Sequence, residues 1–126
     1  HVVVDANDLE GTDVFNLGRE IRYHRAFAPA GTNVNFVTRL EKGLIAIRTY
    51  ERGVEDETLA CGTGSIAAAL VTSEKTGWGS PVRVLTRSGI ELKIYFTRQP
   101  DGYRAVHLEG DARVVYQGEL WEDAYR

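Results

Sequence analysis

The stretch ETLACGTGSIAAAL, Glu57 to Leu70, places the only cysteine of the chain, Cys61, between a polar loop and an apolar run. The residues after Cys61 predict a helix over Ser65–Thr76 that ends at Gly77, the residue type that most easily adopts the left-handed conformation beyond a last turn. Because the first half of this helix is apolar on every side, we expect it to be buried all round. Such a helix needs other elements wrapped around it.

Those other elements are predicted as strands, from apolar alternation bounded by turn residues. The expected strands are His1–Ala6, Asn33–Leu40, Leu44–Glu51, Val82–Arg87, Ile90–Phe96, Tyr103–Glu109 and Ala112–Tyr116. In the last four strands, the positions expected to point inward are Val84, Ile94, Val106, Leu108 and Val114. The prediction is an α+β fold, in which a mixed, mostly antiparallel sheet wraps around a central buried helix.

A second helix is expected between the first two strands. Asp13 is suited to cap it, and the pattern extends to about His24 with Val14, Leu17 and Ile21 on one face. The acidic run Glu55–Glu57 is expected to be a solvated loop.

Composition limits the possible functions. With 126 residues the chain is expected to form one domain. A net charge of −3 gives no electrostatic reason to expect nucleic acid or an anionic membrane as a partner, and no apolar run approaches the roughly 20 residues of a membrane helix. One cysteine cannot form an internal disulfide, which favours a cytoplasmic location. Three histidines far apart in the sequence give no metal-ligand spacing, so no metal is expected.

The residues around Cys61 favour binding of an anion. Gly62 and Gly64 allow a ligand to approach the backbone closely. If a helix begins at about Thr63, its first unpaired N–H groups point toward whatever lies beside Cys61, which suits a carboxylate and favours a thiolate over a thiol. A helix end contributes at most ~2 kcal/mol, so it cannot hold the sulfur ionised alone. On these local features, inert packing of the thiol remains the alternative.

Several segments together resemble one known family. The segment TYERGVEDETLACGTGSIAAA (Thr49–Ala69) resembles the second cysteine motif of diaminopimelate epimerases, and AGTNVNFV (Ala30–Val37) resembles their substrate-contacting asparagine motif. The later segments PVRVLTRSGIELKIYF and LEGDARVVYQGEL resemble the closing hairpins. The opening His1-Val2-Val3 falls where an Asn-Pro-His motif of the family would end.

The resemblance implies a cofactor-independent epimerase with two similar domains, each wrapping a sheet around a helix. In that family two cysteines face each other across the α-carbon, and they interconvert LL- and meso-diaminopimelate for lysine and cell-wall synthesis. For this chain the resemblance implies Cys61 as the acid/base, with Glu51 and His1 adjusting the acidity of the thiols. The implied substrate-binding residues are Asn33, Glu51, Arg52, Gly62 and Thr63.

The chain differs from the family pattern in one large respect. It has a single cysteine, so it cannot supply both of the opposed thiols. The chain also opens on a strand-like segment and contains no methionine. We therefore expect residues 1–126 to be the C-terminal half of the enzyme, without the N-terminal domain that carries the second cysteine. Alone it should fold but be inactive, and the full-length enzyme is expected to be a homodimer.

Three other functions remain open from the sequence. A related racemase of the proline racemase type has the same architecture, but its cysteine motif usually follows a different segment. An acyl-transfer enzyme would need a histidine base beside Cys61, for which His1, His24 and His107 are the candidates. A catalytically silent binding or scaffold module would keep the fold and lack the partner thiol.

Overall fold

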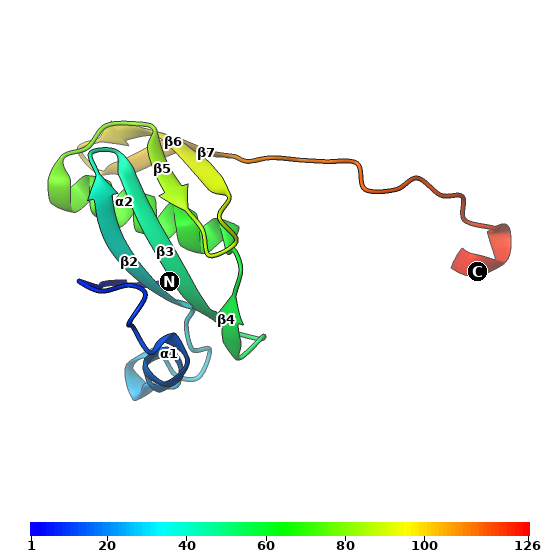
Figure 1. Ribbon diagram of the computed structural model, residues 1–126, viewed down its shortest axis with the longest axis horizontal. Helices are drawn as coiled ribbons and strands as arrows, with labels where there is room; N and C mark the ends of the chain where they lie inside the picture. The colour runs from blue at the N-terminus through cyan, green and yellow to red at the C-terminus, as the bar shows by residue number, and fades with distance from the viewer.

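The fold is a curved sheet with one helix, α2, along its inner face (Figure 1). A computed structural model describes all residues, 1–126. The strands are β1 (Val2–Asp5), β2 (Val34–Glu41), β3 (Leu44–Glu51), β4 (Asp56–Thr58), β5 (Val82–Leu85), β6 (Glu91–Gln99) and β7 (Gly102–Glu109). The helices are α1 (Val14–Arg22), α2 (Gly62–Thr76) and the short 3-10 turns η1 (Arg25–Phe27) and η2 (Glu122–Tyr125).

The sheet is mixed and mostly antiparallel, which confirms the predicted α+β class. Its order is β1-β2-β3-β5-β6-β7, and the short strand β4 pairs with β3 outside this path. Only two pairs are parallel, β1 with β2 and β3 with β5. The strands β1 and β7 are therefore the two edges of a half-barrel.

The main core lies between the sheet and α2. It gathers apolar side chains from β2, β3, β5 and β6 against two alanines of the helix, namely Val37, Ile45, Ile47, Val82, Val84, Ile94, Phe96, Ala68 and Ala69. The inward positions predicted at Val84 and Ile94 are confirmed, since both are fully buried.

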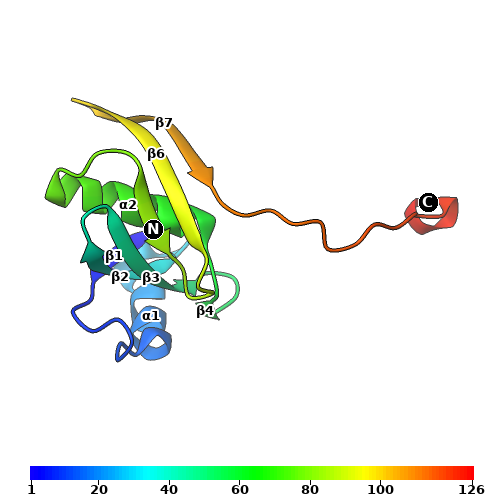
Figure 2. The same cartoon turned by 45° about the horizontal axis from the view of Figure 1, so that its top comes forward.

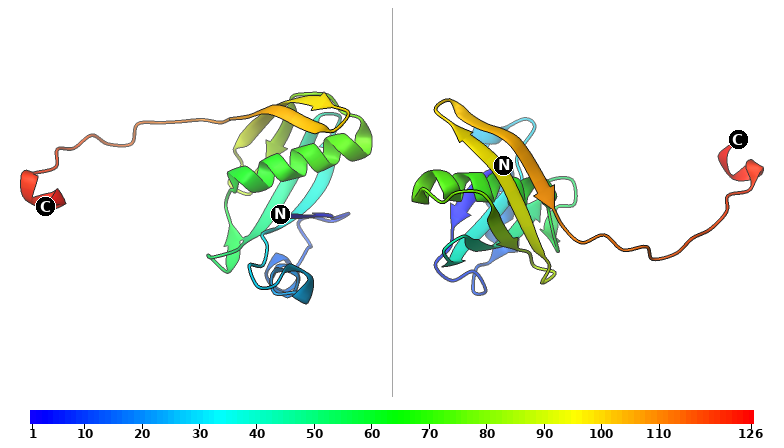
Figure 3. Two further views of the ribbon diagram at one scale, coloured as in Figure 1. Left: turned by 180° about the vertical axis from the view of Figure 1, so that it is seen from behind. Right: turned by 90° about the horizontal axis from the view of Figure 1, so that it is seen from above.

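The helix α2 is not buried all round, contrary to the prediction. The face toward the sheet carries mainly small side chains, namely Gly64, Ser65, Ala68, Ala69, Thr72 and Ser73. The larger apolar residues Ile66, Leu70 and Val71 are only half-buried, and Ile66 and Leu70 contact the margin of the main core. The reason is that the sheet curls over only one side of the helix, as the view from behind shows (Figure 3). The predicted end of the helix at Gly77 is confirmed, with a φ of 76°.

The seventh predicted strand, Ala112–Tyr116, does not form. After β7 the chain runs as an extended segment away from the sheet and ends in η2 (Figures 1 and 2). Without a neighbouring strand the inward position predicted at Val114 fails, and this residue is 92% exposed. Val106 and Leu108 on the edge strand β7 are also exposed, because no element covers them there.

The helix α1 packs against β2 and β3, over a second, smaller core. Its predicted cap is confirmed, because the Asp13 carboxylate accepts a hydrogen bond of 3.1 Å from the Asn16 N–H. Val14 is buried in this core beside Tyr50. Leu17, predicted for the same face, is 45% exposed instead, since it is Gly18 that lies against the Tyr50 ring.

Candidate functional site

Cys61 is the residue immediately before α2, and its backbone sets the first turn of that helix. Its φ of −139° and ψ of 110° are extended, while its carbonyl accepts hydrogen bonds of 2.9 Å from both the N–H and the hydroxyl of Ser65. As at any helix start, the N–H groups of residues 62–64 have no partner within the helix. The helix thus begins at Gly62, three residues before the predicted Ser65 and one before the Thr63 start considered for anion binding. Its free donors lie next to the sulfur.

The thiol itself lies at the margin of the core. Cys61 is 8% exposed, and its Sγ is 3.8 Å from the Thr63 hydroxyl. Gly62 and Thr63 are both exposed to solvent. The sulfur is therefore next to two residues that a ligand can reach, rather than sealed in apolar packing.

A small cavity of about 110 Å³ brings three of the predicted site residues together. It is lined by His1, Asn33 and Arg52, with Gly31 and Thr32. The Asn33 Oδ1 accepts a hydrogen bond of 2.8 Å from the Arg52 backbone N–H, and the Arg52 guanidinium donates one of 3.2 Å to the Ala30 carbonyl. Arg52 has no acidic partner, so its positive charge is available to a carboxylate.

Asn35, which the sequence analysis did not single out, connects this cavity to the cysteine turn. Its side chain is completely buried. The Nδ2 atom is 3.3 Å from Nδ1 of His1 and 2.9 Å from the Val2 carbonyl, which accepts its proton. On the other side, Oδ1 faces Gly64 so closely that a Cβ added there would be 2.3 Å from it. The same added Cβ would be 3.2 Å from the Cys61 sulfur.

Glu51 and Arg52 stand at the start of a tight turn that Glu55 holds in place. The Glu51 carbonyl accepts hydrogen bonds from the N–H groups of Val54 and Glu55. Its carboxylate makes no hydrogen bond, so the structure leaves it free beside Arg52. Glu55 adopts a left-handed conformation with a φ of 60°, which is uncommon for a residue with a side chain.

The Glu55 carboxylate is not the solvated group that the sequence predicted. It accepts hydrogen bonds of 2.6 Å from the Tyr23 hydroxyl, 2.8 Å from the Gly53 N–H and 3.0 Å from Nε of Arg22. These donors, with Tyr23 contributing most, lower the pKa of Glu55 from 4.5 to about 2. The turn that carries Glu51 and Arg52 is thereby fixed to α1.

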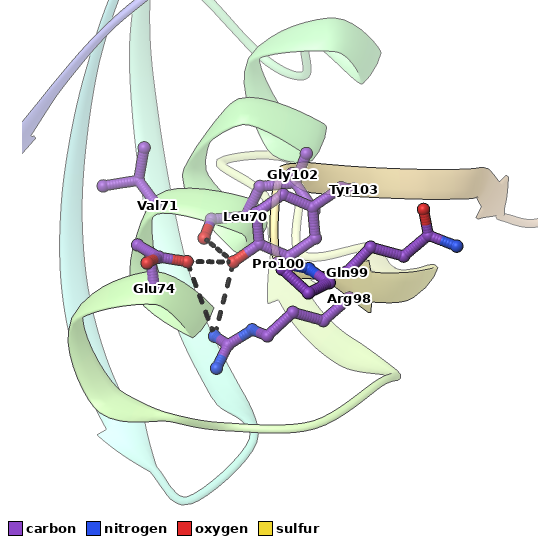
Figure 4. A pocket seen from close by; sticks show the side chains of 8 residues that line it. All are labelled: Leu70, Val71, Glu74, Arg98, Gln99, Pro100, Gly102 and Tyr103. Carbon is purple, nitrogen blue, oxygen red and sulfur yellow. Dashed lines mark hydrogen bonds and ion pairs between the residues drawn. The ribbon is translucent and has the colours of Figure 1, made fainter.

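A larger cavity of about 530 Å³ lies elsewhere, between the middle of α2 and the tip of the β6–β7 hairpin (Figure 4). Leu70 and Val71 form its apolar wall. Across it, the Tyr103 hydroxyl donates a hydrogen bond of 2.8 Å to Glu74, and Arg98 lies 3.8 Å from the same carboxylate. None of the predicted site residues lines this cavity, so it is separate from the cysteine turn.

The histidines do not provide the base that acyl transfer would need. None of the three forms a hydrogen bond with Cys61: His1 contacts Asn35, His24 accepts from the Ala26 N–H, and His107 lies 2.8 Å from the Ala105 carbonyl. The structure therefore does not favour a cysteine nucleophile activated by histidine. No three His, Cys, Asp or Glu side chains gather as metal ligands do. None of the helices has both the length and the apolar character required to cross a membrane.

Comparison with known proteins decides the family. The sequence model of diaminopimelate epimerase matches residues 1–115. The chain belongs to the diaminopimelate epimerase family. Among its relatives, the diaminopimelate epimerase of Aquifex aeolicus is 48% identical over 98% of this chain and 43% of its own length. That of Hydrogenobaculum is 47% identical over 94% of this chain and 42% of its own length.

This diaminopimelate epimerase family chain thus spans less than half the length of these relatives. Among solved structures, a predicted epimerase from Pseudomonas aeruginosa is similar over 81% of this chain and 33% of its own length. The TM-score is 0.56 and the sequence identity is 18%. A phenazine biosynthesis protein of the PhzF family from Bacillus anthracis covers 79% of this chain and 31% of its own, with a TM-score of 0.54 and 18% identity. At such low identity these likenesses concern the fold alone.

Proposed function

We propose that this chain is the C-terminal, Cys61-bearing half of a cofactor-independent diaminopimelate epimerase. The observation that carries the proposal is the position of Cys61, directly before α2 and beside its unpaired N–H groups. A carboxylate bound at those groups would place an adjacent α-carbon next to the sulfur. The names of the relatives supply the substrate, diaminopimelate.

In this mechanism Cys61 exchanges one proton with the α-carbon. As a thiolate it takes the α-proton, while a thiol on the opposite face gives its proton to the same carbon, so the configuration inverts and the two sulfurs exchange protonation states. The N–H groups of Gly62 and Thr63 hold the α-carboxylate as negative charge develops. Arg52 and Asn33 bind the remaining polar groups of the substrate, and Glu51 and His1 adjust the acidity of the thiols.

The second thiol must come from another domain, because Cys61 is the only cysteine here. Two features support such a partner. The apolar face of α2 is half-exposed, and the segment after β7 exposes large apolar side chains, namely Val114, Val115, Tyr116, Leu120 and Trp121. Surfaces of this kind are usually covered by another element. The partner is the N-terminal domain, the complete enzyme is a cytoplasmic homodimer, and this chain alone is inactive.

The test is a chimera in which this chain replaces the matching part of the Aquifex aeolicus relative, with that relative as the positive control. Incorporation of deuterium from D2O into the α-carbon of LL-diaminopimelate measures proton exchange. The chimera should turn over, the Cys61→Ala chimera should lose at least three orders of magnitude, and this chain alone should show no exchange. Asn16→Ala, on the outer surface of α1, is the matched control and should retain activity.

Three results would contradict the proposal. Exchange catalysed by the Cys61→Ala chimera would remove the cysteine from the mechanism. Exchange by this chain alone would remove the need for a second thiol. Activity of the chimera on proline instead of diaminopimelate would point to a racemase of the proline type.

A further inference from the structure

We propose that Asn35 is a positioning residue that fixes the imidazole of His1 in one tautomer and holds the cysteine turn against the sheet. The relevance of these contacts to catalysis rests on the proposed function, which places His1 and Cys61 in one site. The contacts themselves do not depend on it. Asn35 lies on β2, and its side chain makes a hydrogen bond or close contact with residues of β1, β3 and α2.

The orientation of the Asn35 amide is determined by its partners. The Val2 carbonyl can only accept a hydrogen bond, so the atom 2.9 Å from it must be the NH2 group. The Oδ1 atom then accepts the 2.9 Å hydrogen bond from the Thr49 hydroxyl. Exchanging the oxygen and nitrogen of the Asn35 amide would place its oxygen against the Val2 carbonyl oxygen. Because the amide is completely buried, no water could supply the lost hydrogen bond.

This orientation decides where the His1 ring carries its proton. The second N–H of the Asn35 amide faces Nδ1 of His1 at 3.3 Å. A nitrogen that accepts a hydrogen bond has no proton, so neutral His1 must carry its proton on Nε2. His1 lines the cavity with Asn33 and Arg52, so the tautomer decides whether the other ring nitrogen, Nε2, is a donor or an acceptor toward a ligand, and here it is a donor.

The oxygen of the same amide packs against the cysteine turn at Gly64. It occupies the space in front of Gly64, the residue that also faces the Cys61 sulfur. Only a residue without a Cβ fits between them. Asn35 therefore determines which nitrogen of His1 is the donor, and it also fixes the position of the turn that carries the thiol.

Nuclear magnetic resonance on the present chain tests this directly. With 15N-labelled histidine and asparagine, and with His24→Gln and His107→Gln to leave one imidazole, the neutral ring of His1 should show the Nε2–H tautomer. A trans-hydrogen-bond 15N–15N coupling between Nδ2 of Asn35 and Nδ1 of His1 should be detectable. Finding the neutral ring mainly as the Nδ1–H tautomer would overturn the proposal without any substitution at Asn35.

Substitutions at Asn35 give the second readout. Asn35→Asp offers His1 only acceptor oxygens, so the preferred tautomer should invert to Nδ1–H, whereas Asn35→Ala should give a mixture of both. Asn16→Ala, which removes an exposed amide, should leave the His1 signals unchanged. A merely structural role for Asn35 would lower stability without inverting the tautomer, and an unchanged tautomer in folded Asn35→Asp would contradict the proposal.

The two proposals can fail separately. An inactive chimera combined with the Nε2–H tautomer would reject the proposed function and retain the role of Asn35. An active chimera combined with the Nδ1–H tautomer would support the proposed function and reject the role of Asn35.

Discussion

The two ends of α2 differ in how closely the sheet holds them. At its N-terminal end, Gly64 touches the buried amide of Asn35, and no side chain larger than hydrogen fits there. Farther along, Leu70 and Val71 face a cavity of about 530 Å³, and the polar groups around it are partly exposed. The end that carries the thiol is tightly packed, whereas Leu70 and Val71, on another face of the helix, are only half-buried.

This difference separates the requirements of a site from those of an interface. Chemistry needs groups held within a fraction of an ångström, which dense packing and buried hydrogen bonds provide. An interface needs exposed apolar surface of suitable shape. The following predictions test whether substitutions around the two regions of α2 change the free energy of unfolding by different amounts, as the difference in packing implies.

The largest effect is expected at Arg48, which supports the strand leading into the cysteine turn. Its guanidinium makes hydrogen bonds of 2.6 and 2.7 Å to Glu57 and also donates to the Leu9, Glu10 and Thr12 carbonyls. Arg48→Met leaves the Glu57 charge without this partner and should cost about 3 kcal/mol in urea unfolding. Arg87→Met, the control, removes an exposed partner of Glu57 and should cost less than about 1 kcal/mol. Equal losses of stability in Arg48→Met and Arg87→Met would show that the Arg48 contacts do not hold this region more firmly than an exposed ion pair.

Next in size is Gly64→Ala. Alanine would normally stabilise a helix relative to glycine, but here its Cβ would meet Asn35 and Cys61, so a net loss of about 1–3 kcal/mol is expected. The matched control is Gly62→Ala, whose Cβ would meet only Leu108 at an ordinary 3.5 Å. Urea unfolding measures both, and a stable Gly64→Ala chain would show that this end is not tightly packed.

At the open end, Tyr103→Phe should have a smaller effect. The lost hydroxyl donates to Glu74 at 2.8 Å in a solvent-exposed network, which is worth about 0.5 kcal/mol. The ring itself should stay packed edge-on against Phe96, with 5.3 Å between centroids. Thermal unfolding checks the value, and a loss as large as that of Gly64→Ala would abolish the contrast between the two ends.

The smallest effect concerns pH. Because the pKa of Glu55 falls from 4.5 to about 2 on folding, the stabilisation by this carboxylate is complete above about pH 4.5 and is lost as the pH falls toward 2. The difference in melting temperature between the chain and Glu55→Gln should therefore shrink over that range. Glu119→Gln, which removes an exposed carboxyl group of the segment after β7, is the control. A constant difference for Glu55→Gln would mean that its hydrogen bonds do not depend on charge.

Much of the fold could be predicted because local patterns and the structure agree. The turn Glu41–Gly43 between β2 and β3, the Asp13 cap and Gly77 each fix a boundary through the backbone or the nearest side chains. The prediction for Leu17 failed because Gly18, and not Leu17, lies against the Tyr50 ring. The failure at Ala112–Tyr116 has another cause. Periodicity shows which residues would face a partner element, but it cannot show whether that element is present.

The site could be predicted only in part, for a related reason. Cys61, Gly62 and Thr63 are recognisable because they are consecutive and stand where a helix begins. Asn35 was missed because its role comes from pairing across strands, with Thr49 directly opposite it in the register of β2 and β3. Glu55 was missed because an acidic loop gives no sign of the tyrosine and arginine that α1 brings to it.

The edge of the sheet at β7 has a consequence for how the chain behaves at high concentration. Its outer backbone groups are free, and the next residues include the β-branched pair Val114 and Val115 in a fully extended segment. Unpaired strand edges are templates for other strands. Two copies can satisfy each other by exchanging these segments, so the chain should form reversible dimers and larger aggregates as its concentration rises.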